Sequence, residues 1–172
     1  MTQSVPPQPQ QPTDGNPYAQ QPFAQQPGAM PPAPVAPARG GNVVLGVVTA
    51  VVVALVTAGI YGAIVGATEY EIGYAAIGVG FLVGFAAGKV GGSNPALPVI
   101  SALLSLGAVY VGQLIGVGLL GADIAGISAT EMFTEHFAVI TEAWKESADA
   151  MTFLFFAIGA FAAFSGAKKA AA

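Results

Sequence analysis

The sequence predicts an all-α membrane protein: a polytopic helical bundle with four transmembrane helices, a disordered N-terminal tail and an extracytoplasmic amphipathic helix. Of its 172 residues, 54% are apolar and only 8% are charged, whereas about a quarter of the residues in a soluble domain carry charge. Eleven of the 13 prolines lie in the first 40 residues, and 20 of the 23 glycines follow them. Two physically different segments therefore meet near Gly40.

Residues 1–40 form the first segment, a run of Pro, Gln and Ala that includes Pro6-Pro7-Gln8-Pro9. Prolines at this density remove backbone donors and favour solvated, extended conformations. We therefore expect a disordered Pro/Gln-rich tail, and we expect no signal peptide because a basic start and an adjoining apolar stretch are missing. The Pro-x-x-Pro spacings leave open whether a proline-binding partner docks on the tail.

Residues 41–172 form the membrane domain, in which four apolar stretches are each long enough to cross about 30 Å of hydrocarbon. Capping signals separate the stretches. Thr68 and Glu71 form a capping box before the second stretch, and Asn94 with Pro95 provides an N-cap before the third. The predicted spans cover residues 43–67, 72–90, 95–120 and 151–167.

The positive charges predict the orientation, because Lys and Arg near span ends are retained in the cytoplasm. If both termini are cytoplasmic, Arg39, Lys89, Lys168 and Lys169 lie inside and only Lys145 lies outside. Eight of the nine acids then lie on the outer side. We therefore expect the N- and C-termini in the cytoplasm.

Small residues recur every fourth position in three of the predicted spans, a spacing that lets helix backbones approach closely in lipid. We expect these small-residue stripes to pack helices together. The first two stripes either press against each other as an antiparallel pair or mediate dimerisation, and Gln113 beside the third is expected to hydrogen-bond another helix. The predicted packing residues are Gly46, Ala50, Ala54, Ala58, Gly62 and Gly66 in the first span, Gly80, Gly84 and Gly88 in the second, and Gly112 and Gly116 in the third.

The segment between the third and fourth spans predicts an amphipathic helix over about residues 128–149, which starts at a second capping box formed by Ser128 and Glu131. Acids occupy one face and apolar side chains the opposite face. Lipid, the bundle and another protein are alternative partners for the apolar face. The helix either lies on the membrane or continues into the fourth span. Its predicted partner-contact residues are Phe133, Phe137, Ile140 and Trp144.

The composition argues against chemistry and against several classes of ligand. The chain has no cysteine and a single histidine, His136, whose neighbouring acids we place on a different helix face, so we predict no metal site, no cofactor and no enzyme. Five Lys and Arg in a chain of net charge −4 argue against nucleic acid. The interiors of the spans lack the acids, histidines and arginines that are typical of pumps. No residue in them points to a small-molecule substrate.

The run TEYEIGYAAIGVGFLVG at residues 68–84 resembles a hairpin of small, uncharacterised bacterial multi-pass integral membrane proteins. The resemblance covers Val43 to about Gly92, and the Pro/Gln-rich tail is similar to cytoplasmic tails of high-GC Gram-positive membrane proteins. It implies a location in the bacterial cell (inner) membrane and implies no activity.

Together these features predict a structural or accessory subunit that acts through helix packing and protein association. The alternative is a small membrane transport or channel component. The expected partners are the lipid bilayer and either further copies of the chain, in a homo-oligomer, or a larger membrane complex.

Overall fold

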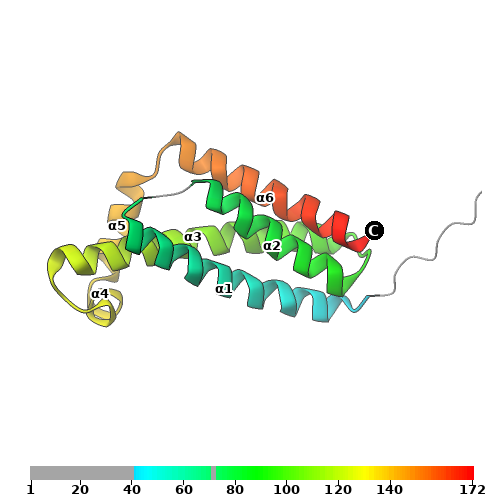
Figure 1. Ribbon diagram of the computed structural model, residues 1–172, viewed down its shortest axis with the longest axis horizontal. Coiled ribbons are helices and arrows are strands. Elements are labelled where there is room, and N and C mark those ends of the chain that lie inside the picture. Colours follow the sequence, from blue (N-terminus) through cyan, green and yellow to red (C-terminus); the bar gives the residue numbers. More distant parts are fainter. Residues whose placement is uncertain (1–40, 71–72) are drawn as a thin grey trace, which may run out of the picture. The chain divides into compact units, whose positions relative to one another are not determined.

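The computed structural model describes residues 41–70 and 73–172. This part of the chain forms the predicted all-α bundle, with six helices of which four are long and apolar enough to cross a membrane (Figure 1). The tail expected at residues 1–40 and the acid Glu71 lie outside the described residues.

The four long helices lie close to the predicted spans, although the third and fourth extend five and four residues beyond their predicted ends. Lys168 and Lys169 lie within the last turn of the fourth helix, where positive charge is favourable against the helix dipole, and so they do not terminate it. The long helices are α1 (Val43–Thr68), α2 (Gly73–Gly91), α3 (Ala96–Ala125) and α6 (Ala150–Ala171).

The third helix ends at Gly126, whose φ of 66° lies in the left-handed region. The N–H of Ile127 donates to the carbonyl of Ala122 at 3.1 Å, which is the bond that closes a helix in the Schellman motif. The helix therefore continues past Leu120, where the predicted span ends, and Gly121 lies inside it.

Two predicted caps are present. The side-chain oxygen of Asn94 accepts the N–H of Ala96 at 2.9 Å at the start of α3. The hydroxyl of Ser128 accepts the N–H of Glu131 at 3.1 Å and starts the short helix α4 (Ala129–Glu135). Each cap satisfies an amide that has no partner within its helix.

The capping box predicted between Thr68 and Glu71 includes a residue outside the described ranges, but the structure does show the position of Thr68. Thr68 is the last residue of α1, and its hydroxyl donates to the carbonyl of Ile64 at 2.7 Å. A threonine hydroxyl bonds readily to the carbonyl four residues back along its own helix, so Thr68 extends α1 instead of starting α2. The chain leaves α1 at Glu69, with a left-handed φ of 58°.

The spans alternate in direction, so the starts of α1 and α3 lie at the same end of the bundle as the ends of α2 and α6 (Figure 1). In the turn between α2 and α3, the hydroxyl of Ser93 donates to the carbonyl of Ala171 at 3.1 Å. Gly46 near the start of α1 lies against the backbone of Gly91 at the end of α2. These contacts tie the four helices together at one end.

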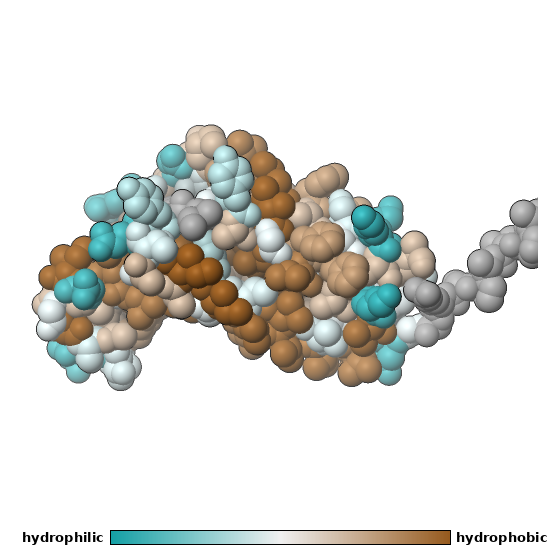
Figure 2. All heavy atoms as spheres, viewed as in Figure 1, coloured by the Kyte–Doolittle hydropathy of each residue, from teal (hydrophilic) through white to brown (hydrophobic). Residues whose placement is uncertain are grey.

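The two ends of the bundle differ in charge, and the middle is apolar. Figure 2 shows hydrophilic residues toward the two ends and apolar side chains between them, and the outward face of α1 exposes Val, Leu and Ile. We name the ends by their charged residues within the described ranges. The basic end carries Lys89, Lys168 and Lys169, and the acidic end carries Glu69, Asp123, Glu131, Glu135, Glu142, Glu146 and Asp149 with Lys145.

Candidate functional site

The predicted stripe on α2 packs against α6. A Cβ added to Gly84 would overlap the carbonyl oxygen of Ala163, and one added to Gly88 would overlap that of Ala167. Gly80 lies in the same way against the carbonyl of Gly159. Along this contact the residue numbers of α2 and of α6 increase in the same direction, so the two helices are parallel. Their backbones are in contact at three successive positions.

The stripe on α1 packs mainly against α3. A Cβ on Gly62 would lie 2.5 Å from the Cβ of Ile115, and a Cβ on Gly66 would lie 2.8 Å from the Cβ of Leu119. The predicted α3 glycines, Gly112 and Gly116, are buried in the same contact. The pair is also parallel. The remaining predicted residues of the α1 stripe are buried as well: Gly46, Ala50, Ala54 and Ala58.

The hypothesis that the first two stripes press against each other is therefore wrong over most of their length. Near the basic end, Gly46 of the α1 stripe does contact α2, but at Gly91, which is not part of the predicted α2 stripe. The residues that complete the α2 contact are Gly159, Ala163 and Ala167 of α6, which the sequence analysis did not single out. Their spacing of four residues is the signal that could have found them.

The amphipathic segment forms two helices instead of one. The chain bends at His136, with φ −116° and ψ 22°, between α4 and α5 (Phe137–Ser147). The bend allows apolar residues before and after it to reach α3: the ring of Phe133 and the side chain of Ile140 both contact Gly118. Burial of these groups against α3 outweighs the propensity for one straight helix, since each large apolar side chain contributes about 1.5–3 kcal/mol.

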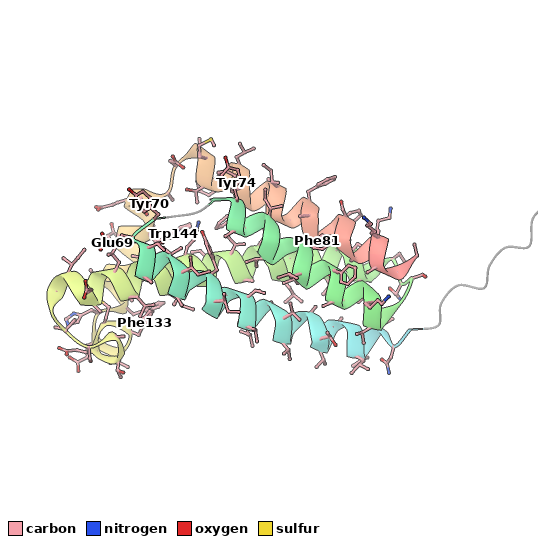
Figure 3. All side chains as sticks on the ribbon, viewed as in Figure 1. Glu69, Tyr70, Tyr74, Phe81, Phe133 and Trp144 are labelled. Carbon is pink, nitrogen blue, oxygen red and sulfur yellow. The ribbon has the colours of Figure 1, made fainter. Side chains whose placement is uncertain are left out.

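The apolar face of this segment is thus covered largely by the bundle itself. Ile140 is 1% exposed, Phe133 and Trp144 are half-buried, and Phe137 remains 48% exposed. Figure 3 shows Phe133 and Trp144 at the acidic end. The sequence left lipid, the bundle and another protein as possible partners of this face. The bundle covers three of the four predicted contact residues, and Phe137 is the exception.

A side-chain hydrogen bond from Trp144 connects α5 to α3. Its indole N–H donates to the side-chain oxygen of Gln113 at 2.9 Å, which confirms that Gln113 bonds another helix. The ring of Tyr110 packs edge-on against Trp144 with centroids 4.8 Å apart, and Phe156 of α6 stacks on Trp144 at 6.5 Å. A buried indole N–H needs such a partner, so this pair fixes the register of α5 on the bundle.

Two small cavities at the acidic end meet Gln113. One of about 170 Å³ is lined by Tyr61, Asp149 and Thr152, and one of about 150 Å³ by Glu69 and Trp144. Farther from the acidic end along α3, the fully buried hydroxyls of Ser105 and Ser101 make no hydrogen bond to the described residues. The two cavities thus place polar groups inside the bundle at its acidic end.

The acids near His136 were expected on a different face, and this expectation is wrong. Because the chain bends at His136, ligand atoms of Glu131, Glu135 and His136 lie within 4.8 Å of one another. Carboxylates and an imidazole are ligand types that a divalent cation accepts. Glu135 and His136 are exposed to solvent.

The chain leaves helical geometry after α5 and starts α6 at a new N-cap, Asp149. The alternative of one helix continuing from the amphipathic segment into the fourth span is therefore wrong. The Asp149 carboxylate accepts the Thr152 N–H at 2.8 Å and its hydroxyl at 3.0 Å. The backbone N–H of Thr152, followed by its hydroxyl, holds the pKa of Asp149 below its usual value of 3.8. Asp and Thr favour helix starts because their side chains replace the missing backbone partners.

No family of proteins, no curated protein and no solved structure matches this chain.

The α2–α6 contact predicts the effect of adding one methyl group. Gly84→Ala should force α2 and α6 apart and destabilise the fold by about 1–3 kcal/mol, because overpacking a close contact costs this much. The measurement is the Tm of the purified protein in a mild detergent. Gly78→Ala is the matched control: Gly78 lies on the same helix and a Cβ there meets nothing within 4 Å. Equal Tm values for the two variants would contradict the close contact.

The cap of α6 predicts a pH dependence of stability. Because the folded state lowers the pKa of Asp149, its contribution is present above the unfolded pKa and is lost as the pH falls through the folded pKa. Asp149→Asn keeps a capping oxygen that does not titrate. The Tm difference between the wild type and Asp149→Asn should therefore shrink as the pH is lowered from 7 to below 3.8, whereas a constant difference would mean that the carboxylate does not cap α6.

Proposed function

We propose that the chain is a structural or accessory subunit of a membrane assembly, acting through helix packing and protein association and not as an enzyme. The observation that carries this proposal is how the bundle is filled. Glycine and alanine backbones close the contacts between parallel helices, and the charged residues of the four long helices occur only in their last turns. Pumps place ionisable groups within the membrane instead.

The small-residue stripes are used within the bundle, so association needs another surface. A groove of about 200 Å³ between α1 and α3 supplies one; its lining is apolar throughout and includes Leu55, Leu103 and Gly107. A Cβ at Gly107 would meet nothing within 4 Å, and Leu55 and Leu103 are 65% and 64% exposed. We propose that an apolar transmembrane helix of another subunit, either a second copy or a partner, packs here, since close approach at a glycine favours helix association in lipid.

We further propose a location in the bacterial cell (inner) membrane with both termini in the cytoplasm. The support is the charge of the two ends: within the described ranges Lys89, Lys168 and Lys169 share one end, while Lys145 is the single base at the other. The basic end then faces the cytoplasm under the positive-inside rule.

A second candidate is a small transport or channel component. The observation that favours it is the pair of cavities beside Gln113, together with the buried hydroxyls of Ser101 and Ser105 below them. Gln113 and the two hydroxyls are neutral, Asp149 and Glu69 line the cavities, and the cavities end in the acidic half of the bundle. Uptake or conductance by the purified protein in liposomes separates the two functions, because a packing subunit produces neither.

The orientation predicts the reactivity of two introduced cysteines. The chain has no native cysteine, and Ser147 and Ser93 are exposed at the acidic and basic ends. In intact cells, an impermeant thiol reagent should label Ser147→Cys and should label Ser93→Cys only after lysis. The reverse pattern would overturn the orientation, and labelling of both without lysis would overturn the alternation of the spans.

The groove predicts that one substitution weakens association without weakening the fold. Gly107→Leu should fill the groove and weaken association by about tenfold, which corresponds to a loss of about 1.4 kcal/mol of binding free energy. The Tm of the monomer should not change. Association is measured by the mass of the detergent-extracted complex. Gly78→Leu, an equally open glycine outside the groove, should leave the mass unchanged. Unchanged association in both variants would mean that lipid chains occupy the groove.

A further inference from the structure

The largest of the cavities described here lies at the basic end, away from the site around Gln113. It is an open cavity of about 430 Å³ between the α2–α3 turn, the first turn of α3 and the end of α6. This volume falls in the range of about 300–1,000 Å³ that is typical of small-molecule sites. The hydrogen bond from Ser93 to the carbonyl of Ala171 joins the turn to α6 and closes one edge of the cavity.

The lining of the cavity is amphipathic along the direction of the bundle. Phe164 and Pro98 form an apolar wall, whereas Lys168 and Asn94 form the polar rim. Phe164 precedes Lys168 by four residues in α6, so it lies about one helical turn, or 5.4 Å, deeper in the membrane. A ligand that fills the cavity therefore needs a polar group at the membrane surface and an apolar part below it.

The polar rim offers hydrogen-bond donors. The Lys168 ammonium lies 5.5 Å from the centre of the Phe164 ring, and the ion pair formed among the described residues is that of Lys145 with Glu142 at the other end. The side-chain oxygen of Asn94 accepts the N–H of Ala96. Its NH₂ group makes no hydrogen bond within the part of the chain that the structure describes and is a second donor.

The side-chain charge of this end favours an anion, whereas the negative ends of the α2 and α6 dipoles, which lie at the same end (Figure 1), oppose one. Among the described residues, the charged side chains at this end are all lysines: Lys89, Lys168 and Lys169. The acidic side chains of the described residues lie at the opposite end. An anion with an apolar body, placed where a membrane-spanning bundle meets the headgroup layer, is an anionic phospholipid. Basic pockets between transmembrane helices bind such headgroups through their phosphate.

We propose that this cavity binds the phosphate group of an anionic phospholipid, with Lys168 and Asn94 as its donors and with Phe164 and Pro98 against the lipid's glycerol and first acyl carbons. Free inorganic phosphate has the same recognition chemistry for the rim, and it lacks the part that would contact the apolar wall.

The test measures lipid binding to the purified full chain in a neutral detergent by native mass spectrometry. The probes are dioleoylphosphatidylglycerol, dioleoylphosphatidylcholine and inorganic phosphate. We expect phosphatidylglycerol to bind more tightly than phosphatidylcholine, and Lys168→Gln to weaken it about fivefold, which is the effect of one lysine near a membrane surface. Lys169→Gln removes the same charge from the neighbouring position, which does not line the cavity, and should change the affinity less than twofold.

A second variant tests the cavity without changing any charge. Ala171→Phe places a ring in the lining and should abolish phosphatidylglycerol binding. The elution volume of the protein should not change. This variant also tests the proposed lipid site if Lys168→Gln does not fold. Equal losses in the two lysine variants would mean general surface charge and would overturn the proposal, as would equal binding of the two lipids. Displacement of the lipid by an equal concentration of inorganic phosphate would overturn the lipid assignment in favour of free phosphate.

Discussion

The carbonyl oxygen of Ala163 on α6 lies where a side chain would stand on Gly84 of α2, and the bundle depends on contacts of this kind. Helices in lipid gain no hydrophobic free energy from meeting, because acyl chains are as apolar as leucine. They associate through dispersion contacts and backbone approach, and both require small residues. The α2–α6 and α1–α3 pairs meet this requirement, each with its two helices running in the same direction.

Parallel pairing has a consequence for the connections. Helices that are adjacent in sequence run in opposite directions, so a parallel partner must come from a span further along the chain. The connection between α3 and α6 contains α4 and α5, and it returns the chain to α2 over the acidic end. Gly118 of α3 admits the Phe133 ring and the Ile140 side chain, while the bond from Trp144 to Gln113 fixes the position of α5. The segment that the sequence marks as amphipathic therefore packs on α3 at this end.

The two ends offer different chemistry to their surroundings. The acidic end combines polar cavities around Gln113 with the exposed cluster of Glu135 and His136. The basic end combines lysines with an amphipathic cavity. Between them the surface is apolar and matches lipid. The described residues thus form surfaces of different chemistry at the two ends of the bundle and between them (Figure 2).

The sequence by itself determined the all-α class, the four long apolar helices, the caps at Asn94 and Ser128, the bond of Gln113 to another helix, and the small residues of the first three spans that pack. These follow from local physics: apolar length, side-chain oxygens that satisfy free amides, and the spacing of small residues. The tertiary structure decided which stripe meets which, because every glycine stripe is complementary to every other and periodicity carries no information about its partner. It also decided the bend at His136 and the resulting approach of Glu131 to it. No glycine or proline marks that bend, and the burial of Phe133 and Ile140 against α3, a contact between residues distant in sequence, produces it.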